Sequence, residues 1–370
     1  MPYNTIKHVL PLFSFRGKYK TAEEIHSGNI NNTYHLVYTE GRKEFHYTLQ
    51  HINTYVFKDP CAVMQNIAMV TNHLKESYQK DGISFDRRVL ELVYTRDGES
   101  FYLDKDGDYW RAYVYINHAT AHDYVKKPEH FFETGRAFGE FQKRLADFPA
   151  HDLTETIPGF HNTTKRFYAF VRSIDVDKAN RVRDLDDEIE FFFQRRKMMG
   201  AIVKPLESGV LPLRATHNDT KINNVMIDDK TDKALCVIDL DTVMPGSSLY
   251  DYGDAIRFGA STAAEDEPKT EKISLDLEKF TLFTRGYLSE TNGFLKPEEL
   301  QLLPLGVKVI TCELAMRFLT DYMDGDPYFR VRSPDHNLIR ARAQMKLLTD
   351  IERKEDEMQS IVERIIKEKQ

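Results

Sequence analysis

A short polar segment in the second half of the chain carries the residue types that phosphoryl transfer needs. It reads His-Asn-Asp-Thr-Lys-Ile-Asn-Asn from His217 to Asn224. Asp219 is suited to accept a proton from a hydroxyl group, and Lys221 can face the transferred phosphoryl group. Asn224 and the later Asp239 offer oxygen ligands for Mg²⁺. Phosphoryl transfer depends mainly on positioning and charge neutralisation, so these few groups are chemically sufficient.

The residues after this segment favour the same chemistry. Two short apolar strands are expected at residues 225–227 and 235–238, and the second runs into Asp239. The order and spacing are those of a protein-kinase-like catalytic loop followed by a metal-binding aspartate. A capped surface turn is the alternative, but it gives no reason for Lys221 and the two strands to occur together.

Three further residues, one within this segment and two after it, are assigned expected roles. His217 is predicted to be a structural hydrogen-bonding residue rather than a general base. Asp251 precedes an apolar helical stretch and is predicted to be a buried support for the loop. Asp241 is expected either to bind the metal or to cap its own loop, and the sequence favours neither role over the other.

The candidate nucleotide-binding residues are less distinctive. The chain contains neither Gly-x-x-x-x-Gly-Lys-Ser/Thr nor Gly-x-Gly-x-x-Gly. Residues 27–33 form a polar segment with one glycine, whose backbone N–H groups could bind phosphates, although a plain hairpin would have the same composition. The next strand lacks the lysine of protein kinases, and Gln50 or His51 would replace it as a neutral donor. The nucleotide-binding candidates are Gly28, Asn29, Asn31, Thr33, Gln50, Tyr115 and Asn117.

The elements expected around these residues differ between the two parts of the chain. The first part is rich in strands, with a single helix that begins at Pro60 behind the capping residue Asp59. The acidic turn 104–108 lacks the glycine and glutamate positions of an EF-hand loop, so it is expected to be a hairpin tip. The strands of this part are expected at residues 33–38, 45–52, 89–94, 101–103 and 110–116.

The second part is mainly helical, and we expect an α+β, bilobal, protein-kinase-like fold. A nucleotide-binding lobe with an antiparallel sheet would span residues 1–116, and a larger catalytic lobe residues 117–370. A hinge near residues 115–118 would leave a ligand-binding cleft between the lobes. Helices are expected at residues 128–148, 187–207, 275–288, 305–323 and 335 to the end.

Composition excludes several other classes of protein. The 370 residues carry a net charge of −7 and have no apolar run long enough for a membrane helix. A mildly acidic chain without a basic stripe is not expected to bind nucleic acid. Three widely spaced cysteines support neither a disulfide framework nor a zinc site. We therefore expect a reduced, cytoplasmic, monomeric enzyme or binding protein with no membrane partner.

The chain resembles the small-molecule kinases related to aminoglycoside phosphotransferases and choline kinases, and within them the N-acetylhexosamine 1-kinases. The resemblance covers nearly the whole chain. It rests on segments 28–34, 49–53, 214–221, 237–246, 250–262 and 312–322. The long blocks that follow Val237 and Tyr250 are more specific than the kinase-like loop.

This resemblance implies Mg²⁺- and ATP-dependent phosphorylation of the anomeric hydroxyl of N-acetylglucosamine or N-acetylgalactosamine, giving the sugar 1-phosphate. It implies that Asp219 is the base that orients this hydroxyl, and that Asn224 and Asp239 hold metal. Arg317 and Tyr328 would contact the sugar. Alternatively, Arg317 would form a buried ion pair with an aspartate such as Asp321, and Tyr328 would be a core or lid aromatic residue.

Two other functions fit the same motifs. One is a kinase on the same scaffold for choline, a methylthioribose-like sugar, homoserine or an aminoglycoside. A choline site would need an aromatic cage and an aminoglycoside site an acidic cleft. The other is a nucleotide-binding regulatory protein without catalytic activity, against which the joint presence of Asp219, Lys221, Asn224 and Asp239 speaks.

Overall fold

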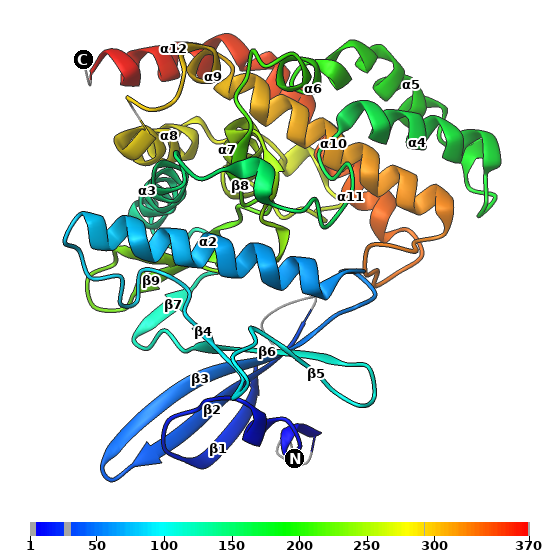
Figure 1. Ribbon diagram of the computed structural model, residues 1–370. Helices are drawn as coiled ribbons and strands as arrows, with labels where there is room; N and C mark the ends of the chain where they lie inside the picture. Colours follow the sequence, from blue (N-terminus) through cyan, green and yellow to red (C-terminus); the bar gives the residue numbers. More distant parts are fainter. Residues whose placement is uncertain (1–4, 26–30, 292, 369–370) are drawn as a thin grey trace. The chain divides into compact units, whose positions relative to one another are not determined.

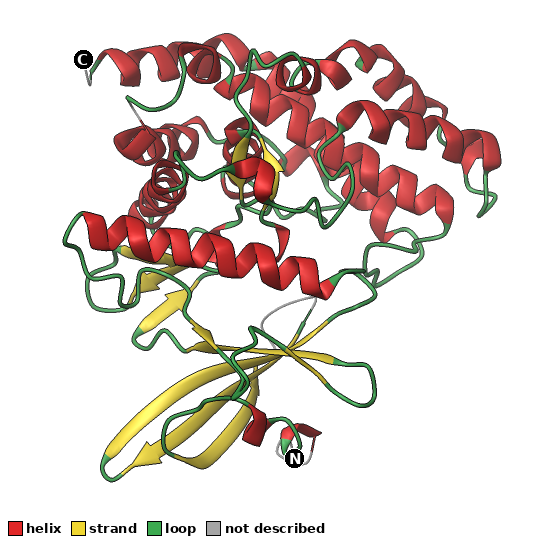
Figure 2. Cartoon of the chain, viewed as in Figure 1, coloured by secondary structure: helices red, strands yellow, loops and turns green. Residues whose placement is uncertain are grey.

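The computed structural model describes residues 5–25, 31–291 and 293–368. The chain forms two compact units, shown in Figures 1 and 2. The first unit comprises Met1–Thr120 together with Met226–Val243, and the second comprises Ala121–Val225 together with Met244–Gln370. The expected division after residue 116 took no account of the later segment that the first unit includes.

An antiparallel sheet forms the centre of the first unit, as expected. Its strand order is β1-β2-β3-β6-β4, and β5 also pairs with β6. The predicted strands at 33–38 and 45–52 are confirmed, whereas the one at 89–94 is reduced to two residues. β1 was not predicted because none of its residues is buried, so it has no apolar pattern. The strands are β1 Lys18–Ile25, β2 Asn32–Glu40, β3 Lys43–Ile52, β4 Leu92–Val93, β5 Tyr102–Leu103 and β6 Tyr109–Val114.

The two faces of this sheet have different chemistry. Successive side chains of a strand point to opposite faces, and Leu36, Leu49 and Ala112 lie on the face that packs into the apolar core. Gln50 is the cross-strand partner of Thr33 on one side and of Arg111 on the other, so these three share the opposite, polar face.

The remaining elements of the first unit are a helix and a small sheet. Helix α2, Pro60–Lys80, begins as predicted, and the Asp59 carboxylate accepts the backbone N–H of Ala62 at 3.0 Å. The acidic turn is a hairpin tip as predicted, because the Asp104 carboxylate accepts two backbone N–H groups of its own turn. The small sheet contains β7 Ala119–Ala121, β9 Val225–Asp228 and β10 Ala234–Val237.

The second unit is mainly helical (Figure 2). Helix α10, most of which is buried, packs against α11, α7 and α4 (Figure 1). Two short strands, β8 Arg214–Thr216 and β11 Met244–Gly246, pair antiparallel. The helices are α3 Pro128–Arg144, α4 Thr163–Val176, α5 Asp186–Gln194, α6 Val203–Glu207, α7 Ser248–Gly259, α8 Leu277–Thr291, α9 Pro297–Gln301, α10 Leu303–Asp324, α11 His336–Arg353 and α12 Glu355–Lys367.

Two helix predictions in this unit were wrong in extent. The helix expected at 187–207 is divided into α5, a 3₁₀ turn (Arg196–Gly200) and α6. Pro205 lies near its end and lacks the N–H that a continuous helix would need. The helix expected from residue 335 to the end is interrupted at Lys354, which separates α11 from α12. Helix α4 was not predicted.

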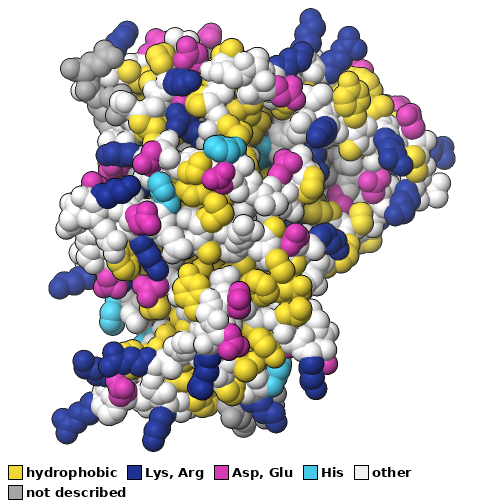
Figure 3. Space-filling model, viewed as in Figure 1, with side chains coloured by type: hydrophobic (Ala, Val, Ile, Leu, Met, Phe, Trp, Pro, Cys, Tyr) yellow, Lys and Arg dark blue, Asp and Glu magenta, His cyan; other side chains and the backbone are white. Residues whose placement is uncertain are grey.

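Charged side chains of both signs lie on one face of the molecule. On the face drawn in Figure 3, basic and acidic groups are interspersed. Among the helices that the structure describes, none is both long enough and apolar enough to cross a lipid bilayer.

Candidate active site

The predicted catalytic loop follows β8 and is held by a buried carboxylate. Asp251, on α7, accepts the backbone N–H of His217 at 2.9 Å and that of Asn218 at 2.7 Å. Gln142, on α3, donates to the same carboxylate at 2.7 Å. Asp251 is 1% exposed, and burial raises its pKa despite these donors. The predicted role of Asp251 as a support for the loop agrees with these contacts.

His217 also supports the loop. Its ring is buried and lies edge-on to the ring of Phe138, with the centroids 5.5 Å apart. The backbone N–H of Asp219 donates to its Nδ1 at 3.3 Å. A buried imidazole that accepts a backbone hydrogen bond is oriented by the fold, as predicted for a structural residue. The next residue, Thr220, is fixed by Asp254, which accepts its backbone N–H at 3.0 Å.

The three chemically important side chains of the loop contact one another. Lys221 Nζ lies 2.7 Å from Asp219 Oδ1. Asn224 Nδ2 donates to the backbone oxygen of Asp219 at 2.8 Å and to its Oδ2 at 3.2 Å. Since the amide nitrogen faces Asp219, the amide oxygen is the atom of Asn224 that would bind a cation. The side chains of Asp219 and Lys221 are about one-third exposed and can therefore meet a ligand.

Electrostatics keeps both members of the Asp219–Lys221 pair charged. Burial raises the pKa of Asp219, but the charge of Lys221, together with His217 and Arg257, lowers it to below its usual value. Burial lowers the pKa of Lys221, but the neighbouring carboxylates, led by Asp219, raise it above its usual value. Asp219 is consequently an ionised but weak base at neutral pH, which suits a hydroxyl group that is already somewhat acidic.

The predicted metal ligands Asn224 and Asp239 flank the β9–β10 segment in the sequence. Strand β9 follows Asn224 directly, and β10 ends just before Ile238 and Asp239. Asp239 has a left-handed backbone conformation, with φ at 59°, and precedes the 3₁₀ turn Leu240–Thr242. This conformation is uncommon for residues other than glycine, although aspartate and asparagine adopt it more readily than most. The amide and carboxylate oxygens are ligand types that fit Mg²⁺.

An unpredicted arginine lies beside this turn. Arg111 Nη2 donates to Asp241 Oδ2 at 2.9 Å, and Nη1 contacts the other carboxylate oxygen. Arg111 Nε donates to Gln50 Oε1 at 2.9 Å. The ion pair is buried, which favours the structural role among the two expected for Asp241. A charged residue within the apolar strand Trp110–Val114 was the sequence signal for this arginine.

The predicted nucleotide-binding residues are partly brought together. Gly28 and Asn29 lie outside the described residues. Gln50 Nε2 donates to Thr33 Oγ1 at 3.1 Å, and Asn31 Nδ2 donates to Asp241 at 2.8 Å. Through these bonds the five residues Asn31, Thr33, Gln50, Arg111 and Asp241 form one hydrogen-bonded network, called here the Arg111 network. The Tyr115 ring packs 4.4 Å from that of His35, on β2. The carbonyl of Asn117 accepts a hydrogen bond from Arg87 at 2.8 Å.

The two predicted sugar-binding residues lie together in the second unit. The guanidinium of Arg317 is 5.5 Å from the ring centre of Tyr328, and the rings of Phe160 and Phe329 lie at 4.9 and 5.4 Å. The alternative partner Asp321 was wrong: its carboxylate accepts backbone N–H groups of the following loop. The carboxylate nearest to Arg317 is Glu313, at 3.6 Å.

Glu313 connects Arg317 to two residues that sequence reasoning missed. His161 Nδ1 lies 3.1 Å from both Glu313 oxygens. Burial raises the pKa of Glu313, but His161, Arg317 and Arg166 together lower it below its usual value. Burial and the charge of Arg317 lower the pKa of Arg166. Thus one buried carboxylate faces two guanidinium groups and an imidazole. His161 lies just before α4 and Arg166 lies on it, and both were missed because this helix was not predicted.

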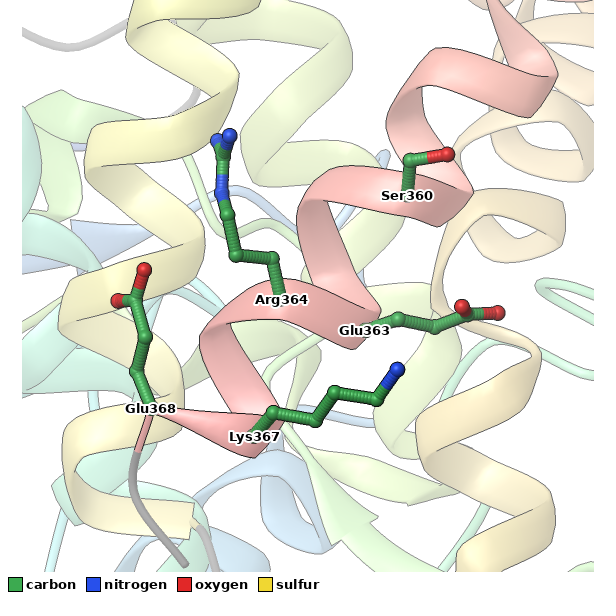
Figure 4. Close-up of a pocket in the computed structure, with 5 residues that line it drawn as sticks. All are labelled: Ser360, Glu363, Arg364, Lys367 and Glu368. Carbon is green, nitrogen blue, oxygen red and sulfur yellow. The ribbon is translucent and has the colours of Figure 1, made fainter.

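A hollow elsewhere in the second unit contains none of the predicted residues. It has a volume of about 490 Å³ and lies along α12. As Figure 4 shows, its lining side chains come from that helix and from the residue that directly follows it, and they are Ser360, Glu363, Arg364, Lys367 and Glu368. This hollow has no connection to the chemistry described above.

Solved structures of small-molecule phosphotransferases are similar to this chain over nearly their full length. An aminoglycoside phosphotransferase from Alicyclobacillus acidocaldarius has a TM-score of 0.57 and 12% identity, covering 98% of this chain and 95% of its own. A choline/ethanolamine kinase family protein from Mesorhizobium loti has a TM-score of 0.55 and 16% identity, covering 97% and 98%. Spectinomycin phosphotransferase APH(9)-Ia, solved with ADP and spectinomycin, has a TM-score of 0.55 and 13% identity, covering 94% and 96%. At these identities the similarity establishes the kinase-like α+β fold.

The sequence itself establishes the family. The model of the phosphotransferase enzyme family APH matches residues 21–278, which is well over half of the chain. The matched range includes the predicted catalytic loop, the segment 239–242 (the Asp239 turn) and the Arg111 network. The chain therefore belongs to the APH phosphotransferase enzyme family.

Proposed function

We propose that this protein is an ATP- and Mg²⁺-dependent kinase that phosphorylates the anomeric hydroxyl of N-acetylglucosamine or N-acetylgalactosamine. The observation that carries the kinase assignment is the Asp219–Lys221–Asn224 group, held in place by the buried Asp251. Membership of a phosphotransferase family supports ATP as the donor, as does the ADP in the structure of spectinomycin phosphotransferase.

In this proposal each residue of the loop has a defined task. Asp219 orients the acceptor hydroxyl and takes its proton as the oxygen attacks the γ-phosphorus. Its lowered pKa makes it a weak base, which is sufficient because an anomeric hydroxyl is more acidic than an ordinary alcohol. Lys221 stabilises charge on the transferred group. Asn224 and Asp239 would hold Mg²⁺, which neutralises phosphate charge when it is bound.

The surroundings of Arg317 favour a neutral acceptor over a cationic one. Aromatic rings that surround a cation are the usual recognition site for choline, but here the guanidinium of Arg317 already occupies that position. Two guanidinium groups against the single carboxylate of Glu313 also leave an excess of positive charge, which would repel an aminoglycoside.

A sugar with an acetamido group matches the same residues. Its carbonyl oxygen could accept a hydrogen bond from Arg317, and an apolar sugar face could pack on the ring of Tyr328, which is 46% exposed. The positions of these two side chains, together with the resemblance to N-acetylhexosamine 1-kinases, are the basis for proposing N-acetylhexosamines rather than homoserine or another small alcohol.

The test is ADP release with Mg²⁺ and ATP over a panel of acceptors. The panel contains N-acetylglucosamine, N-acetylgalactosamine, glucose, galactose, choline, homoserine and an aminoglycoside, and phosphorus NMR identifies the product. Formation of an N-acetylhexosamine 1-phosphate is the expected result. Turnover of choline or an aminoglycoside would refute the sugar assignment but retain the kinase. Binding of ATP without turnover of any acceptor would favour a non-catalytic regulatory protein.

A further inference from the structure

The turn that carries Asp239 is fixed to the rest of the first unit through its neighbour Asp241. Both oxygens of Asp241 are bound by Arg111, and one of them also accepts from the Asn31 amide. One residue beyond the 3₁₀ turn, the carbonyl of Val243 accepts from Asn66, on α2, at 2.9 Å. These contacts hold the chain two to four residues beyond Asp239, whose left-handed backbone is uncommon for a residue other than glycine.

Arg111 connects this turn to the polar face of the sheet. Arg111 Nε donates a hydrogen bond to Gln50 Oε1, and Gln50 Nε2 in turn donates to Thr33 Oγ1. Gln50 lies on the strand where protein kinases carry a phosphate-binding lysine, which is missing here. Arg111 cannot serve as that lysine, because it is 1% exposed and its guanidinium already binds Asp241 and Gln50. The positive charge of its guanidinium is balanced by the Asp241 carboxylate.

We infer that Arg111 is a positioning residue for metal and nucleotide binding, which fixes the Asp239 turn through Asp241 and the Gln50 amide through its Nε. Arg111 touches neither ligand itself. A planar guanidinium can bind a carboxylate with two parallel hydrogen bonds and a third group with Nε, which an ammonium cannot do. The inference rests on the proposed function for the identity of the ligands, Mg²⁺ and ATP, but the link between Arg111 and the turn does not.

The experiment removes the ion pair without leaving a buried charge. Replacing Arg111 alone by Met would strand the Asp241 carboxylate, so the informative variant combines Arg111→Met with Asp241→Asn. A matched control, Arg195→Met with Glu352→Gln, removes another two-bond arginine–carboxylate pair far along the chain. Hydrogen exchange of residues 239–243 reports on the turn, and calorimetry without acceptor reports on Mg²⁺–ATP binding.

We expect the double variant to exchange hydrogens at 239–243 at least tenfold faster and to bind Mg²⁺–ATP at least tenfold more weakly, while the control changes neither. Unchanged exchange, or faster exchange with unchanged affinity, would overturn the inference. If the double variant does not fold, Arg111→Lys, which keeps the charge but not the geometry, is expected to show the same two effects. If the wild-type protein does not bind Mg²⁺–ATP, the proposed function fails, and exchange alone decides whether Arg111 fixes the turn.

Discussion

Replacing Asp251 by Asn tests whether a buried carboxylate sets the geometry of the predicted catalytic loop. The carboxylate accepts three hydrogen bonds, from two consecutive backbone N–H groups and from Gln142. An amide has only one accepting oxygen, so the Asp251→Asn variant would place its NH₂ group against one of these donors. At least one charge-assisted bond is lost, and a buried N–H is left without a partner.

The magnitude is the balance of two costs and one gain. The lost bond costs about 1.5–3 kcal/mol, and the unsatisfied buried N–H costs about 1–3 kcal/mol more. Burial raises the pKa of Asp251, so removing its charge returns part of this free energy. We expect a net loss of about 2–3 kcal/mol, which for a unit of this size lowers Tm by roughly 4–12 °C. A loop displaced by about 1 Å would lower kcat roughly a hundredfold.

Thermal unfolding followed by circular dichroism, together with kcat at saturating ATP and acceptor, measures both effects. The control is Glu357→Gln, a change at an exposed residue of α12 that should alter stability by less than about 0.5 kcal/mol. A variant with wild-type Tm and wild-type kcat would refute the reasoning. A lower Tm with unchanged kcat would show that Asp251 stabilises the fold without positioning the loop.

Three further predictions concern other groups. Asp219→Asn should lower kcat by about 10²–10⁴-fold, because the base is lost, while Tm changes little; substantial residual turnover would remove Asp219 from that role. Arg317→Met should raise KM for the N-acetylhexosamine at least about tenfold and leave KM for ATP unchanged, and equal changes in both would argue against a sugar contact. The pKa of Asp104 is lowered to about 2, because hydrogen bonds, led by the one from Trp110, outweigh the effect of burial. The ionised carboxylate therefore stabilises the fold above about pH 4, and this stabilisation is lost as the pH falls toward 2. Asp104→Asn should therefore cost about 2 kcal/mol at pH 7 and almost nothing near pH 2, as urea unfolding at the two pH values would show.

Local sequence was sufficient wherever a pattern of neighbouring residues decides the structure. The alternation in β2 and β3 predicted both strands, and Asp59-Pro60 predicted the start of α2. The spacing from His217 to Asn224 predicted that the side chains of Asp219, Lys221 and Asn224 come together, because these residues are only a few positions apart. For the same reason Asp251 could be recognised as a support, since its motif follows the loop at a short distance.

Tertiary structure alone decided which distant side chains meet. Asp241 is 130 residues from Arg111, and no local pattern pairs them; the sheet register and the position of the Asp239 turn do so. Glu313 and His161 are 152 residues apart and meet through the packing of helices, one of which was not predicted. A charged group that is buried away from water must be paired with an opposite charge close to it. Burial is a property of the folded chain and not of any one segment, so the sequence alone did not identify these pairs.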